Sequence, residues 1–137
     1  MNFSTGAISL LEVSHLPHML AAADSFKKGY TAYAIVLTTT IVFSILNHIP
    51  RLDNNILEYT EKGATYVTLV YTIIQFKEYI DAIDVVIAIS AILLYLLALQ
   101  DYNLHKTIYV PTHTLWHLVS GFLIYSIVLK AKNKREV

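Results

Sequence analysis

Long runs of uncharged, mostly apolar residues dominate the pattern of this chain. Residues 29–50 and 107–129 carry no charged side chain, and neither do the shorter runs 63–76 and 85–100. A helix rises ~1.5 Å per residue, so it crosses a hydrocarbon core of about 30 Å with about 20 apolar residues. The two longer runs reach that length alone, and the two shorter ones reach it when they are extended by a few residues. The pattern predicts membrane-spanning helices at 29–50, 56–76, 80–100 and 107–130.

A weaker apolar stretch, residues 6–24, precedes these four runs. Its interior is interrupted by Glu12, His15, Pro17 and His18. No basic segment opens the stretch, so it does not have the pattern of a secretory signal peptide. Two interpretations stay open, a fifth span or an amphipathic helix lying on the membrane. The sequence therefore predicts a single all-α domain over residues 1–137, a polytopic transmembrane helical bundle of four or five spans.

The composition favours a membrane protein over a soluble bundle. Apolar residues make up 55% of the chain and charged residues 15%, with zero net charge. A soluble domain carries about 25% charged residues, which it needs for the polar outer faces of its helices. The absence of cysteine excludes disulfides, thiolate metal sites and a cysteine nucleophile. Without a basic patch, nucleic acid is not an expected partner.

The turns between the four predicted helices are short, so neighbouring helices are expected to run antiparallel. This topology separates the basic residues into two sets. One end of the bundle receives Lys27, Lys28, Lys77, Lys130, Lys132, Lys134 and Arg135, and the other receives Arg51, Lys62 and Lys106. The positive-inside rule then predicts that the richer end, with the C-terminus, is cytoplasmic.

Three polar groups are predicted to converge at the opposite, extracytoplasmic end. They are Ser44 with His48, Glu58 with Glu61, and His113 with His117. Residues four apart share a helical face, so His113 and His117 can point toward one ion. Three histidines with an open fourth position form a known type of catalytic zinc site, which activates water and polarises a carbonyl. A nearby carboxylate can then act as general base, and a serine hydroxyl can stabilise an oxyanion.

Other interpretations of these histidines stay open. Histidine pairs in membrane helices also bind haem or form hydrogen bonds between helices. The three function classes are therefore a metal hydrolase, a bis-histidine haem protein, and a structural or transport protein. His105 is explained by an interfacial loop, and His15 and His18 can either line the bundle or lie on an interfacial helix.

Three segments resemble motifs of a known family, the CREST superfamily. Phe43-Ser44-Ile45-Leu46-Asn47-His48 resembles its F-S-x-x-x-H motif. His113-Thr114-Leu115-Trp116-His117 resembles the H-x-x-x-H motif of its last span. The segment 57–61, with the residues that follow it, is similar to the stretch around the third-span acid in the myomaker branch. The superfamily also includes the alkaline ceramidases and the adiponectin and progestin receptors, and the resemblance covers about half of the chain.

The resemblance implies a zinc site of His48, His113 and His117, with Ser44 and an acid beside it. It also implies hydrolysis of a lipid amide or ester, or a receptor-like or fusogenic derivative of that fold. The family acid is usually aspartate, whereas the matching position here holds Glu61, with Glu58 and Asp53 as alternatives.

The family core also has seven spans, whereas this chain has room for four or five. A loss of two spans before the last one would preserve the convergence of the site. Membrane lipid is thus the expected partner. The alternative is a non-catalytic, metal-stabilised protein that binds lipid or assembles with partners, with a homo-oligomer replacing the missing spans.

Overall fold

The computed structural model describes residues 10–48, 55–104 and 109–134, and these residues are helical with no strand. The elements are α2 (Leu16–Lys27), α3 (Thr31–Asn47), α4 (Asn55–Phe76), the short 3₁₀ helix η2 (Lys77–Tyr79), α5 (Ala82–Asn103) and α6 (Tyr109–Lys130). The all-α prediction is confirmed, and each of the four predicted long helices is present within a few residues of its expected bounds. Some residues used in the sequence predictions lie outside the described ones: Arg51, Asp53, His105, Lys106 and Arg135.

The described part of the stretch 6–24 is helical with an interruption, and whether it spans the membrane or lies on it stays a prediction. A helical turn over 10–13 is followed by a turn at Ser14 and His15, and α2 then begins. Pro17 stands in the first turn of α2, where its missing N–H costs no hydrogen bond, so it favours a new helix start there. The Ser14 hydroxyl donates to the Leu11 carbonyl at 2.6 Å and helps to close the turn.

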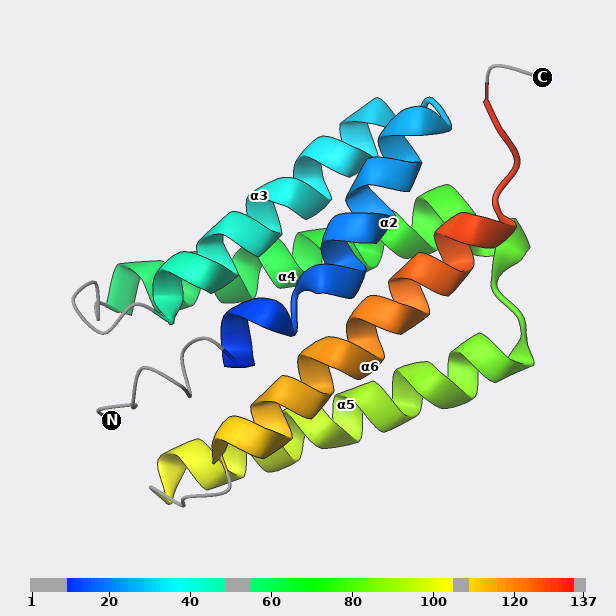
Figure 1. The fold of residues 1–137 in the computed structure, drawn as a ribbon. Helices are drawn as coiled ribbons and strands as arrows, with labels where there is room; N and C mark the ends of the chain where they lie inside the picture. The colour runs from blue at the N-terminus through cyan, green and yellow to red at the C-terminus, as the bar shows by residue number, and fades with distance from the viewer. Residues whose placement is uncertain (1–9, 49–54, 105–108, 135–137) are drawn as a thin grey trace.

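The helices pack side by side in the order α4, α3, α2, α6 and α5, and this curved row forms the bundle (Figure 1). The second helix, α2, packs between α3 and α6, while α4 packs on α3 and α5 packs on α6. The helices α4 and α5 follow one another in sequence, yet they lie at the two ends of this row and do not form a close-packed pair. Side chains of the two helices nevertheless approach one another, since Tyr95 of α5 interacts electrostatically with Lys62 of α4.

Polar contacts set the register of α3 against α4. Tyr33 Oη lies 2.8 Å from Thr72 Oγ1, and Thr40 Oγ1 lies 2.7 Å from Thr68 Oγ1. Hydroxyl pairs of this kind are common between helices in an apolar environment, where small polar side chains hydrogen-bond across the interface. The register brings the last turn of α3 beside the second turn of α4.

One end of the bundle, here called the aromatic end, has an apolar core. Its buried residues are Ala21, Ala22, Tyr30, Tyr33, Leu37, Ile41, Phe76, Ile127, Val128 and Ala131. Gly29 provides the left-handed turn (φ 85°) between α2 and α3. The ammonium of Lys28 donates to the carbonyls of Val128 and Leu129 at 2.7 and 2.9 Å, which satisfies the C-terminal end of α6.

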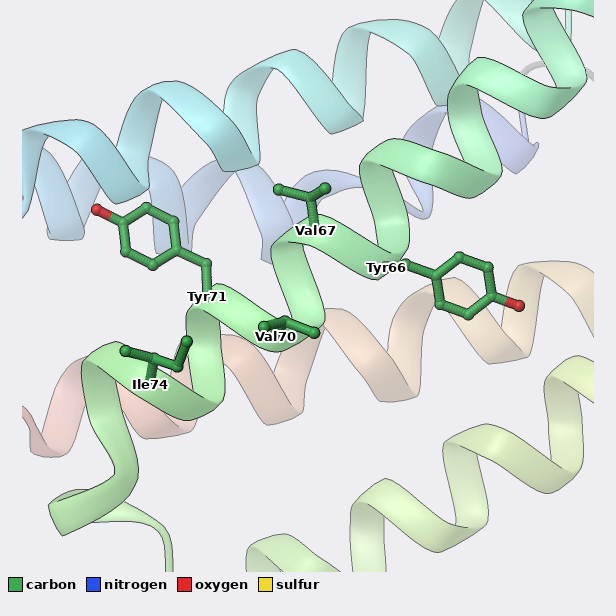
Figure 2. A pocket seen from close by; sticks show the side chains of 5 residues that line it. All are labelled: Tyr66, Val67, Val70, Tyr71 and Ile74. Atoms are coloured by element: carbon green, nitrogen blue, oxygen red, sulfur yellow. The ribbon is translucent and has the colours of Figure 1, made fainter.

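Two of the described helices are long and apolar enough to cross a membrane, 82–101 and 109–130, and α3 is a shorter apolar helix. Much of α5 faces outward, including Ile83, Val86 and Leu93. The outer side of α4 holds a shallow hollow of about 360 Å³ (Figure 2), and all five side chains that line it come from this one helix. The hollow is a surface groove and does not lead to the histidines described below.

Candidate metal centre

The three predicted metal ligands come together at the end of the bundle opposite the aromatic end. His48 is the C-cap of α3, and His113 and His117 lie one turn apart near the start of α6. The Nε2 atom of His113 lies 3.1 Å from Nε2 of His48 and 3.0 Å from Nε2 of His117. All three side chains are buried. The antiparallel topology thus places His48 against His113, which is 65 residues away in the sequence.

A cation explains this arrangement better than hydrogen bonds do. An imidazole nitrogen either donates one proton or offers one lone pair in the ring plane. Nε2 of His113 therefore cannot form good hydrogen bonds to both neighbouring nitrogens. A tetrahedral zinc ion with Zn–N bonds of about 2.0–2.1 Å separates its nitrogen ligands by about 3.3 Å, close to the distances here. The residues thus fit a bound metal ion.

A fourth histidine, His15, belongs to the same cluster. The side chain is 2% exposed, and its ring centroid lies 4.1 Å from that of His117. One ring nitrogen from each of His15, His48 and His117 lies within 4.8 Å of the others, a spacing that can hold a metal ion. His113 is not in this group of three and joins the cluster through its contacts with His48 and His117. The sequence interpretation left His15 open between the bundle and an interfacial helix. The available signal was Pro17, which predicts a helix start directly after this histidine.

The predicted serine and acid also join the cluster. Ser44 Oγ donates to Oε1 of Glu61 at 2.6 Å, and the side-chain amide of Asn47 donates to Oε2. Glu61 is buried, so these two donors replace the water that a carboxylate would otherwise bind. Asn47 was not predicted as a site residue, although it lies three residues after Ser44 on the same helix.

Glu58, an alternative acid in the sequence interpretation, points elsewhere. Its Oε1 forms an ion pair with Lys62 at 2.6 Å, and both side chains are partly exposed. Asp53, the other alternative, lies outside the described residues. Among the described acids, Glu61 is the one that contacts Ser44.

Aromatic rings and a fifth buried histidine surround the cluster. Trp116 packs against His117 with 4.4 Å between centroids, and Tyr109 packs against His113 at 5.0 Å. His18 lies 6.0 Å from His15, centroid to centroid, and rests on the backbone of Gly121. These rings cover the histidines with apolar surface, and a dry surrounding strengthens every electrostatic interaction inside it.

No protein-family model, curated protein or solved structure among those compared matches this chain. The class of protein is therefore defined by its fold and site alone. The chain is an all-helical protein with two possible membrane-spanning helices. It has a buried cluster of histidines that can hold a metal ion.

Proposed function

We propose that this chain is a multi-pass membrane protein and a zinc-dependent hydrolase of a lipid amide or ester, a shortened relative of the CREST superfamily. The observation that carries the proposal is the convergence of three histidine Nε2 atoms beside a buried serine–glutamate pair. Three nitrogen ligands, a nearby general base and an oxyanion donor are the parts that a zinc hydrolase requires.

The distribution of apolar side chains supports insertion of α3 to α6 as four spans, with residues 10–27 packed in the same bundle. Only 17% of the apolar window in α5 is buried inside the bundle. A soluble protein rarely exposes such a long apolar face, because each buried methylene is worth about 0.8 kcal/mol. The lysine-rich end with Lys28 and Lys130 is then cytoplasmic, and the metal centre lies toward the extracytoplasmic side.

The roles of the side chains follow from their contacts. A bound zinc ion would supply Lewis acidity, polarising the substrate carbonyl and activating water. Glu61 accepts the proton of the attacking water and returns it to the leaving amine or alkoxide, so the proton count balances. Asn47 holds Oε2 of this carboxylate and so fixes its orientation. The Ser44 hydroxyl, hydrogen-bonded to Oε1, can turn to donate to the oxyanion that develops on the carbonyl oxygen.

The exposed apolar faces of α4 and α5 support a lipid substrate. Val70 and Ile74 of α4 and Val86 of α5 are exposed, so lipid acyl chains could pack directly against both helices. The same exposed faces can pack against a second copy of the chain, which would replace the spans that a seven-span relative has.

A non-catalytic, metal-stabilised lipid-binding protein is the second candidate. It is favoured by the closeness of His15 to the other histidines, because a fourth nitrogen ligand would leave no open coordination position and closed sites are structural. Haem binding has less support. The ring centroids of His48, His113 and His117 are 4.6 to 5.6 Å apart, which leaves no space for a haem macrocycle between any two of them.

The test is metal content and turnover of the purified full-length protein. We expect one zinc ion per chain and hydrolysis of a ceramide, phospholipid or simple lipid ester. Glu61→Gln should lower turnover at least 100-fold with zinc retained. Glu58→Gln is the matched control, since this acid lies on the same helix but pairs with Lys62. Absence of zinc from the wild type rejects the metal centre. Zinc without turnover on any of these lipids supports the non-catalytic candidate.

A further inference from the structure

His15 is the part of the cluster that the proposed hydrolase does not use. It lies in the turn that joins the helical stretch 10–13 to α2, so it reaches the cluster from a different helical segment than the other three histidines. Its burial and the 4.1 Å between its ring centroid and that of His117 place it inside the cluster.

The backbone fixes which nitrogen of His15 carries the proton. Nδ1 lies 2.9 Å from the carbonyl oxygen of Leu11. A carbonyl only accepts hydrogen bonds, so Nδ1 is the donor, and in the neutral ring Nε2 then bears a lone pair. Metal-ligating histidines are oriented in this way, with the remote N–H donated to a backbone carbonyl or a carboxylate.

The lone pair on Nε2 lacks a proton donor of its own. The polar atom nearest to it is Ser44 Oγ at 2.9 Å. The single hydroxyl proton of Ser44 is directed at Oε1 of Glu61, at the shorter distance of 2.6 Å. Two acceptors thus compete for one proton, and a buried acceptor left without a donor costs about 1–3 kcal/mol.

We infer that His15 is a fourth nitrogen ligand of the metal centre, completing a site of four histidines with His48, His113 and His117. The inference rests on the metal centre of the proposed function and adds a ligand to it. A cation satisfies the lone pair of His15 and leaves the Ser44 proton for Glu61. It also accounts for the spacing of at most 4.8 Å among ring nitrogens of His15, His48 and His117.

A fourth nitrogen closes the coordination sphere in the resting protein. His15 would then hold the position that water or a substrate carbonyl would need in a hydrolase, and it does so from a turn outside the regular helices. His15 would therefore be a displaceable ligand in a hydrolase and a permanent one in a metal-stabilised scaffold.

The test counts imidazole ligands in the full-length protein loaded with zinc or cobalt(II). X-ray absorption of the wild type is expected to show four imidazoles, and His15→Ala should show three plus one oxygen. This variant should also bind zinc at least tenfold more weakly, and its cobalt spectrum should respond to azide. His18→Ala is the matched control, because it removes the neighbouring histidine and should leave four imidazoles.

The outcomes separate this inference from the proposed function. Three imidazoles and one oxygen in the wild type would overturn the role of His15 while leaving the zinc hydrolase intact. A wild-type protein that binds neither metal would overturn both. Because the wild-type count is decisive by itself, the test does not depend on whether His15→Ala folds.

Discussion

The two ends of this bundle use different physical means to hold the same helices together. At the aromatic end, Phe76 is fully buried and packs edge-on against Tyr30 and Tyr33, with 4.9 Å between centroids in each case. At the histidine end, buried polar side chains take the place of such packing. Nδ1 of His48 has no hydrogen-bond partner among the described residues there.

On the proposed function, this difference separates the end that stabilises the fold from the end that binds a ligand. Edge-to-face aromatic packing adds about 0.5–1.5 kcal/mol per pair beyond the burial of the rings, and it needs no ligand. Four histidines in a dry site have no such intrinsic stability, because buried polar groups are costly until they are paired. A bound metal ion would offset the cost of burying these polar side chains. Variants at the aromatic end should therefore mainly lose folding stability, and variants at the histidine end should mainly lose metal binding.

The largest loss of stability is expected from the aromatic end. Phe76→Ala removes a fully buried ring and should lower the free energy of unfolding by about 3–5 kcal/mol, with metal content retained in the folded fraction. Thermal unfolding of the purified protein, read by circular dichroism together with metal analysis, measures both. Phe122→Ala is the control, since Phe122 is 59% exposed and should cost far less. Equal losses in the two variants would contradict the assignment of the core to this end.

A smaller effect is expected where α2 crosses α6 beside the histidines. A Cβ atom at Gly121 would lie 2.7 Å from Nδ1 of His18 and 3.0 Å from Cβ of Pro17. Gly121→Ala should therefore cost about 1–3 kcal/mol by overpacking, and it should weaken metal binding because α2 carries His15 on its N-terminal side.

Gly63→Ala provides the comparison for that variant. Among the described residues, no atom outside its own helix lies within 4 Å of a Cβ at Gly63, so this change should be neutral or slightly stabilising. Chelator competition and thermal unfolding of both variants test the pair. A Gly121→Ala protein as stable as Gly63→Ala would show that α2 is free to shift away from α6.

The sequence predicted the helices well and the cluster in part. The long uncharged runs predicted α3 to α6, because an apolar run of this length usually forms a helix. Because successive helices alternate in direction, the end of α3 and the start of α6 were expected at the same end of the bundle. This placed His48 near His113 and His117. His15 was harder, because its position depends on where Pro17 restarts a helix and on which side α2 packs. The separation of α4 from α5 depends on tertiary packing, which short turns do not reveal.

An ion pair near the aromatic end should have a moderate effect. Lys130 Nζ lies 2.8 Å from Oδ2 of Asp84, whose side chain is 2% exposed. Lys130→Ala leaves this buried carboxylate without its cation and removes a favourable charge from the C-terminal turn of α6, so the melting temperature should fall by several degrees. Lys132→Ala, at an exposed lysine two residues later, should change it little. A fall of the same size in both variants would mean that only net charge matters.

The smallest effect is expected from the exposed partner of that lysine. The hydrogen bond from Lys130 to Asp81, at 2.7 Å, holds the pKa of the Asp81 carboxyl below its usual value. A lowered pKa in the folded state stabilises the protein above the unfolded-state pKa of about 3.9, and this stabilisation disappears as the pH falls through the folded-state value.

Asp81→Asn should therefore lower the melting temperature slightly at pH 7 and leave it unchanged in strong acid. The change stays small because Asp81 is largely solvated and water screens the pair. Melting curves of the wild type and the variant across the acidic range measure it, and the two should converge below pH ~3. Metal content at pH 7 should be the same in both, because Asp81 lies at the aromatic end. A loss of metal in this variant would show that the two ends are coupled, and the division between a stabilising end and a ligand-binding end would then fail.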